Sequence, residues 1–182
     1  EKARELGGAN GLPETLSHKV NHNPAPISFP NGCHVAEVEI DPDTGVVAIE
    51  RYTVVDDFGV VVNPLIVEGQ VHGGIAQGVG QALFEHVVYD PSGQLLTGSL
   101  MDYALPRAAD FPGFSIQFCN TPCHNNVLGV KGAGEAGAIG APQAIISALC
   151  DALSIAHIDM PATPAAIFAA IKNAKPDKEI TY

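Results

Sequence analysis

The chain has 182 residues, of which 46% are hydrophobic; this fits one folded domain with a substantial core and excludes a disordered chain. Its net charge of −11, from 9 basic and 20 acidic residues, argues against nucleic acid or an anionic membrane as a partner. Four scattered cysteines do not make a secreted disulfide framework, so a cytoplasmic setting is expected, and no apolar run reaches the ~18–20 residues of a membrane span.

The N-terminal segment 1–28 is expected to be irregular, because prolines and glycines interrupt it. Apolar residues then alternate with glutamates over 37–40, and a turn-forming sequence follows at 41–45. Because the alternation resumes over 47–54, these residues predict a β-hairpin with one solvated face. Two further extended elements are predicted, a second hairpin at 86–96 and a strand at 114–118.

Three helices are predicted, at 69–86, from Ala141 to about Ala156 and from Pro164 to about Asn173. Pro142 is expected near the first position of the second helix, where a missing N–H costs nothing. Thr163 is expected to cap the third helix. Together these elements predict an α+β fold, in which a mixed or antiparallel sheet with hairpins packs against about three helices over residues 29–182.

The helix predicted at 69–86 carries two stripes. Apolar residues spaced by four predict a face toward the core, and a second stripe is polar or glycine. Each interior glycine lowers the stability of the helix by about 0.8–1.0 kcal/mol relative to alanine, so the glycines need an explanation. One is that a ligand approaches the helix backbone and the glutamine amides bind it. The other is that the helix packs tightly against its neighbours and the glutamines are solvated. The second stripe consists of Gln70, Gly74, Gln77 and Gln81.

The stretch 129–140 holds five glycines, and Glu135 lies among them. Its G-x-G-x-x-G (132–137) is the pattern of a dinucleotide-binding loop, but a carboxylate there would repel phosphates. Alternatively, the glycines let the backbone approach a ligand and place Glu135 in a crowded, partly dry position as a general base. A third interpretation is that Glu135 only caps the next helix or pairs with Lys131.

Several segments occur in a fixed order: DFG (57–59), NP (63–64), VEGQVHGGIAQGVGQALFE (67–85), GSLMDYALP (98–106) and GVKGAGEAG (129–137). This set resembles the carboxy-terminal part of the molybdenum-binding subunit of the molybdenum hydroxylases. That family includes xanthine dehydrogenase, aldehyde oxidase and carbon monoxide dehydrogenase, and the resemblance extends over about 29–171.

The resemblance implies a molybdopterin cofactor, often as its cytosine dinucleotide form in bacteria, whose own dithiolene holds the metal. It implies that Glu135 is the catalytic base and that Gln77 contacts the phosphate region of the pterin. Gln70, Lys131 and Gly134 are weaker cofactor-binding assignments. The implied reaction oxidises an electron-poor carbon of an N-heterocycle, an aldehyde or carbon monoxide, with oxygen taken from water. No metal-ligating side chains are expected, because the Cys119 to His124 stretch is at most half a zinc site.

In this family electrons pass through [2Fe–2S] clusters to FAD, and the chain lacks the cysteine spacing of such a cluster. The implied partners are therefore the remainder of the molybdenum subunit, an iron–sulfur subunit and a flavin subunit. The family's subunit is several times longer, so this chain is expected to be half of a site, as a fragment or as one subunit of a split enzyme. The alternatives are a non-catalytic assembly module and a dinucleotide-binding domain.

Overall fold

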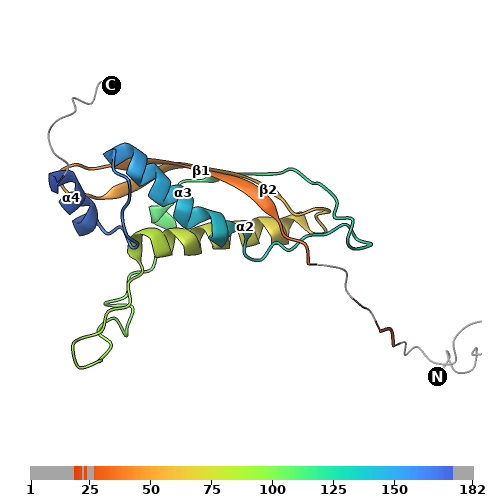
Figure 1. Cartoon of the computed structure of the whole chain (residues 1–182), viewed down its shortest axis with the longest axis horizontal. Helices are drawn as coiled ribbons and strands as arrows, with labels where there is room; N and C mark the ends of the chain where they lie inside the picture. The colour runs from red at the N-terminus through yellow and green to blue at the C-terminus, as the bar shows by residue number, and fades with distance from the viewer. Residues whose placement is uncertain (1–18, 22, 24–26, 174–182) are drawn as a thin grey trace, which may run out of the picture.

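The computed structural model describes residues 19–21, 23 and 27–173. Figure 1 shows two layers, a sheet above and helices below. Within the described residues, the predicted α+β fold with a mixed sheet and three α-helices is confirmed. Strand β2 is central, with β1 antiparallel to it and β3 parallel to it. The elements are β1 (Asn31–Ile40), β2 (Val47–Asp57), α2 (Pro64–Val79), β3 (Phe114–Phe118), α3 (Ala136–Leu153) and α4 (Pro164–Asn173).

The first predicted hairpin is confirmed as β1 and β2. Its turn is stabilised by Asp41, whose carboxylate accepts hydrogen bonds from the Asp43 N–H at 2.9 Å and the Thr44 hydroxyl at 2.7 Å. The face toward the helices buries Tyr52 and Val54, and the opposite face is solvated. This difference between the faces is what the alternation predicts.

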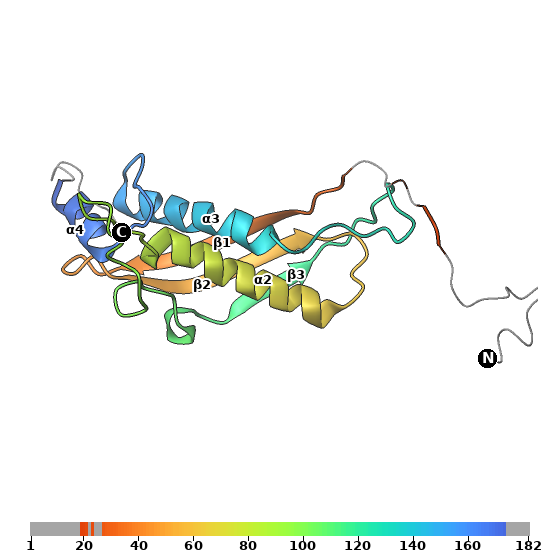
Figure 2. The same cartoon turned by 90° about the horizontal axis from the view of Figure 1, so that it is seen from below.

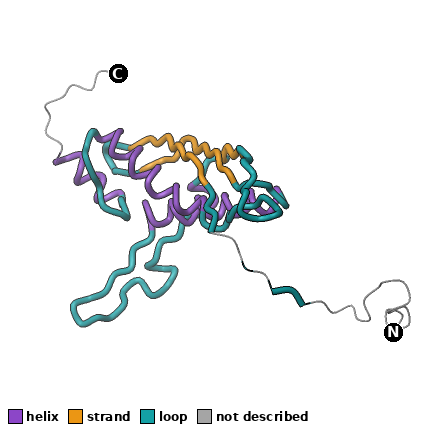
Figure 3. The backbone as a smooth tube through the Cα atoms, turned by 45° about the vertical axis from the view of Figure 1, so that its right-hand side comes forward, coloured by secondary structure: helices purple, strands orange, loops and turns teal. Residues whose placement is uncertain are grey.

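The second predicted hairpin forms no strands. The turn is present, because the Gly93 N–H donates to the Asp90 carbonyl at 3.0 Å, but only one antiparallel bridge, Tyr89 to Leu95, follows it. This segment forms an arm that extends away from the helical layer (Figure 3). A two-stranded ribbon is marginal without a packed face, and the arm exposes its large apolar side chains. These include Val87, Tyr89, Leu96, Leu100 and Met101.

The first predicted helix begins earlier than expected, at Pro64 rather than at residue 69. Asn63 is its N-cap, since its side-chain oxygen accepts from the Ile66 N–H at 3.3 Å, and proline at the first helical position suits the missing N–H. The pattern hid this turn because Leu65 and Ile66 are exposed. A π-helical turn, Gly80–Phe84, continues the helix.

The second helix also begins earlier, at Ala136, so that Pro142 lies in its interior and not at its first position. The proline forgoes one helical hydrogen bond but packs closely against Gly78 of α2. The third helix is confirmed at Pro164–Asn173, with the Thr163 hydroxyl accepting from the Ala166 N–H at 3.3 Å.

Helices α2 and α3 run in parallel beneath the sheet, in contact along a glycine seam (Figure 2). The seam consists of Gly74 and Gly78 on α2 and Gly137 on α3. A Cβ built on Gly74 would lie 2.8 Å from the Gly137 Cα, and one built on Gly137 would lie 2.6 Å from the Val71 carbonyl oxygen. Close packing therefore explains Gly74 and Gly78, whereas Gly73 has no atom within 4 Å of its Cβ position.

By length and composition, α3, with 18 residues, is the one helix among the described residues that could cross a membrane. The expectation of no such run is therefore wrong for this helix. Its buried residues, however, pack against α2 and the sheet, with Ala141, Ile145 and Leu149 fully covered. We interpret α3 as a core helix of the domain.

The glycine seam yields a prediction. Gly74→Ala is expected to lower the free energy of unfolding by about 1–3 kcal/mol, because the new methyl group overlaps the α3 backbone. Gly73→Ala, one residue away and facing open space, is the matched control and is expected to raise it by about 0.5–1 kcal/mol. Urea denaturation followed by circular dichroism measures the free energy of unfolding of both variants. Equal effects of the two substitutions would contradict the close backbone contact at Gly74.

Candidate functional site

Glu135 lies at the N-cap position of α3, and its backbone is anchored beside α2. The next two residues, Ala136 and Gly137, are buried, and Gly137 packs into the seam. The side chain of Glu135 makes no capping hydrogen bond and is exposed. The predicted crowded, partly dry position is therefore wrong for this chain by itself, and the capping interpretation is not supported either.

The glutamine face is the exposed side of α2 and of the π-helical turn that continues it, and it carries Gln70, Gly73, Gln77 and Gln81. Gly74, expected on the same stripe, is instead buried in the seam. Gln70 is close to the Glu135 loop, since its Nε2 lies 3.7 Å from a Cβ built on Gly134. Gln77 is seven residues further along, about 10 Å at 1.5 Å per residue. The structure thus brings Gln70, Gly134 and Glu135 together, with Gln77 about two turns away.

Lys131 has a partner of its own. Its ammonium lies 2.6 Å from Oδ2 of Asp57, and both side chains are only 12% exposed. Asp57 also accepts hydrogen bonds from the N–H groups of Gly59, at 2.8 Å, and Thr121, at 3.0 Å. Burial by itself would raise the pKa of Asp57, but the bonds from Lys131, Thr121 and Gly59 bring that pKa well below its ordinary value. Pairing of Lys131 with Glu135 is therefore not what the structure shows.

The site has open positions that suit a ligand bound along its backbone. Gly73 on the glutamine face and Gly132 in the loop have no atom within 4 Å of their Cβ positions. Amide side chains on this face can both donate and accept, and the first turn of α3 has no side-chain cap. Among the described residues there is no group of three or more His, Cys, Asp or Glu side chains that could hold a metal. The open glycine positions and the exposed amides fit a polar ligand that lies along the backbone.

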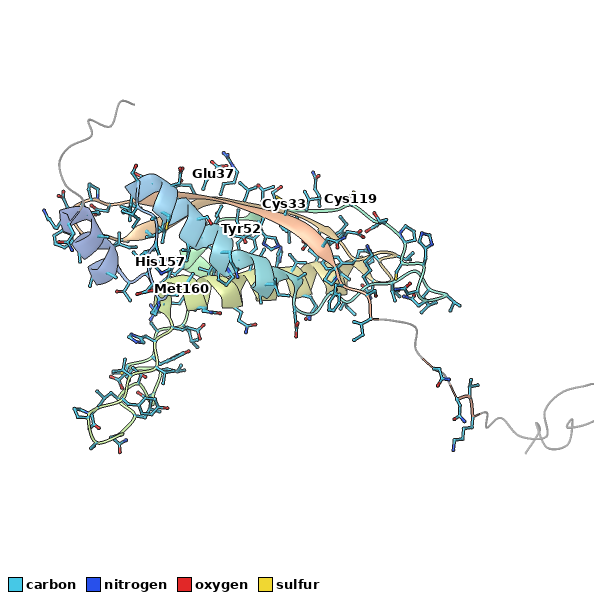
Figure 4. All side chains as sticks on the ribbon, viewed as in Figure 1. Cys33, Glu37, Tyr52, Cys119, His157 and Met160 are labelled. Carbon is cyan, nitrogen blue, oxygen red and sulfur yellow. The ribbon has the colours of Figure 1, made fainter. Side chains whose placement is uncertain are left out.

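A hollow of about 710 Å³ lies toward the other end of the same helix pair. Gln81 and Gln143 line it together with His157 and Met160, which Figure 4 labels below α3, near the end of α2. It does not include Glu135, Gln70 or Gln77. The predicted site residues Gln70, Gln77 and Glu135 are exposed and lie outside this hollow.

The geometry also bears on the dinucleotide interpretation. A dinucleotide-binding loop follows a buried parallel strand, whereas the segment before Gly132 is a loop with a single antiparallel bridge, Val130 to Gly59. The helix begins at Ala136, inside the glycine pattern. The pattern G-x-G-x-x-G lacks its structural context here.

The sequence does not predict a buried polar cluster formed by His34, Tyr52 and Asp56. His34 Nδ1 lies 2.7 Å from the Tyr52 hydroxyl, and its Nε2 lies 3.6 Å from Oδ1 of Asp56. Tyr52 lies between the sheet and the helices (Figure 4), and burial, with the nearby Asp56 charge, raises its pKa strongly. Oδ2 of Asp56 is buried and has no hydrogen-bond partner in the structure. Only Tyr52 lies within a predicted strand; His34 and Asp56 lie just outside 37–40 and 47–54, at positions that continue the same alternation.

The chain is similar in sequence to a known protein family and to known proteins. A family described as a molybdopterin cofactor-binding domain matches residues 8–112. The nicotine 6-hydroxylase large subunit of Paenarthrobacter nicotinovorans is 46% identical over 147 residues, which is 79% of this chain and 18% of that protein. The carbon monoxide dehydrogenase large chain of Hydrogenophaga pseudoflava is 33% identical over 165 residues, 89% of this chain and 20% of that protein.

A solved structure is similar as well. Quinoline 2-oxidoreductase from Pseudomonas putida 86 matches with a TM-score of 0.75 and 42% identity, over 79% of this chain and 19% of that chain. The chain spans about a fifth of the length of the relatives that it matches.

The Asp57–Lys131 pair yields a pH prediction. Because the folded-state pKa of Asp57 is depressed, its contribution to stability is present above about pH 4, the ordinary range of aspartate, and is lost as the pH falls toward the folded value. Asp57→Asn is expected to lower the free energy of unfolding at pH 7 by about 3–5 kcal/mol, since it leaves Lys131 buried without its counter-charge.

Below pH 4 the difference in the free energy of unfolding between the wild type and Asp57→Asn is expected to shrink. Chemical denaturation at a series of pH values measures it. Glu37→Gln, which breaks the exposed pair with Arg51, is the control and should change little. A difference that stays constant down to pH 2 would show that the charge of Asp57 is not responsible.

Proposed function

Since the chain belongs to the molybdopterin cofactor-binding domain of molybdenum hydroxylase large subunits, we propose that it forms one wall of the cofactor site of such an enzyme. The reaction is the oxidation of an electron-poor carbon with oxygen derived from water. The observation that carries the proposal is the position of the loop that holds Glu135 beside Gln70 of the glutamine face.

When bound, the molybdopterin group, in its plain or cytosine dinucleotide form, supplies the two-electron redox centre. Gln77 would bind the phosphate region, because its exposed amide can donate to phosphate oxygens. Gln70 and Gly134 would contact the cofactor nearer Glu135. Lys131 fits a direct contact less well, because its ammonium is already engaged by Asp57.

Glu135 would accept a proton at its carboxylate as oxygen is transferred to the substrate carbon. A general base works best near its substrate with bulk water excluded. This chain leaves Glu135 exposed, so the remainder of the large subunit must provide the covering wall. The chain would therefore be inactive alone.

We propose the substrate class from the names of the relatives. The two relatives named for nicotine and quinoline, both N-heterocycles, are more identical to this chain than the one named for carbon monoxide. An N-heterocycle is thus favoured over an aldehyde or carbon monoxide. The names "large subunit" and "large chain" also indicate complexes with smaller subunits.

The two electrons of each turnover must leave the site. We propose that they pass to [2Fe–2S] clusters and FAD on other domains or subunits of a cytoplasmic complex, with residues 29–182 acting as one domain. The alternative, a non-catalytic assembly module, is favoured by one observation, the exposure of Glu135. Metal analysis of the protein purified with its native partners separates the two, because an assembly module would carry no molybdenum.

Glu135→Gln tests the catalytic assignment in the assembled enzyme. Turnover is expected to fall by about 10²–10⁴-fold, the usual contribution of a general base, while molybdenum content stays near that of the wild type. Steady-state kinetics and metal analysis measure the two quantities. Glu50→Gln, which changes an exposed carboxylate on β2, is the control and should leave both unchanged. Retained turnover in Glu135→Gln would remove the assignment.

Gln77→Ala tests the cofactor contact. Loss of a hydrogen bond to a charged group costs about 1.5–3 kcal/mol, so cofactor affinity is expected to fall roughly 10- to 100-fold. The cofactor retained after extensive dialysis of the assembled enzyme gives the measure. Gln117→Ala, on an exposed position of β3, is the matched control. Equal cofactor retention in the two variants would argue that Gln77 is only solvated.

A further inference from the structure

Glu135 is held by its backbone and not by its side chain, so whatever fixes the backbone fixes the carboxylate. On the C-terminal side, Gly137 is fixed in the glycine seam. On the N-terminal side, the Lys131 N–H donates to the Phe58 carbonyl at 2.8 Å, and the Val60 N–H donates to the Gly129 carbonyl at 2.9 Å. Only five residues separate the two anchors.

The residues between these anchors supply little packing of their own. Gly132 has no neighbour within 4 Å of its Cβ position, and Gly134 and Glu135 are exposed. A glycine-rich segment has a large conformational entropy when it is not held. The direction of Glu135 is therefore set by the anchors at its two ends.

Asp57 is the centre of the N-terminal anchor. Its carboxylate accepts from the Lys131 ammonium, from the N–H groups of Gly59 and Thr121, and from the Asn31 amide at 3.3 Å. These donors come from four segments: the start of β1, the residues after β2, the residues after β3, and the loop before α3. One buried carboxylate thus joins the end of the sheet to the loop that carries Glu135.

We propose that Asp57 and Lys131 are positioning residues for Glu135: their buried ion pair fixes the Glu135 loop against the end of the sheet, and Lys131 does not bind the cofactor. This inference rests on the proposed function, because it takes Glu135 as the base. It gives Asp57 a positioning role. It also replaces the cofactor-binding role that the family resemblance implies for Lys131 with a positioning role.

The test uses Lys131→Met in the assembled enzyme. The methionine keeps an apolar stem in the same space but removes the charge that Asp57 binds. Because a shift of about 1 Å in a reacting group can cost about 100-fold in rate, kcat is expected to fall 10- to 100-fold. KM for the substrate is expected to stay within about threefold, and molybdenum content near that of the wild type. Lys131→Arg, which keeps the ion pair, is expected to recover most of kcat.

Two further measurements make the result specific. Glu37→Gln, which breaks the exposed pair with Arg51, should leave kcat unchanged. In a Glu135→Gln background, Lys131→Met is expected to cause little further loss, because Lys131 acts through Glu135. If Lys131→Met does not accumulate as folded protein, Lys131→Gln keeps a hydrogen-bond donor without charge, and the same expectations apply to it.

Wild-type kcat in the folded Lys131→Met enzyme would overturn the proposal. So would loss of molybdenum with kcat per bound cofactor unchanged, which would make Lys131 a cofactor ligand, and so would a full additional loss in the Glu135→Gln background. Failure of the proposed function gives a different result, since Glu135→Gln by itself would then remain active.

Discussion

The close contact between the backbones of Gly74 and Gly137 is the constraint on which the arrangement of the domain depends. It brings two parallel helices together without intervening side chains, so their apolar residues form one layer beneath the sheet. Glycine inside a helix costs about 1 kcal/mol relative to alanine, and burial of Ile75 and Ile145 on the same helices offsets that cost. The same contact determines where α3 begins, and therefore where Glu135 is placed.

Helix α3 depends on glycine on its other side as well. A Cβ on Gly140 would lie 2.6 Å from the His34 ring, so α3 lies directly against the imidazole that contacts Tyr52. The cluster of His34, Tyr52 and Asp56 occupies a layer that is otherwise apolar, and a buried acceptor without a partner costs about 1–3 kcal/mol. The helix is thus fixed between α2 and β1 by small residues, and little freedom remains for its first turn.

Sequence reasoning predicted the elements whose signals are local. The turn at Asp41, the alternation of β1 and β2 and the Thr163 cap all lie within a few residues of one another, and all were confirmed. It misplaced the starts of α2 and α3, because exposed Leu65 and Ile66 break the helical pattern and Pro142 suggested a helix start. The Asp57–Lys131 pair joins residues 74 positions apart, which no local pattern can predict. The family was recognisable because several long motifs occur in order, whereas the exposure of Glu135 depends on the packing around it, which no motif reports.

The proposed half of a shared site requires exposed polar side chains on a fixed backbone. If Glu135 and Gln77 were enclosed by this chain alone, no room would remain for a second wall, yet the chain spans only about a fifth of its relatives. If they were exposed on a loosely held loop, a second wall would have to order them at the cost of conformational entropy. Instead the polar side chains are exposed while the seam and the buried Asp57 fix the backbone beneath them. In the proposed enzyme, docking of the remaining polypeptide would need only to exclude water, because the backbone that carries the proposed base and cofactor ligand is already fixed.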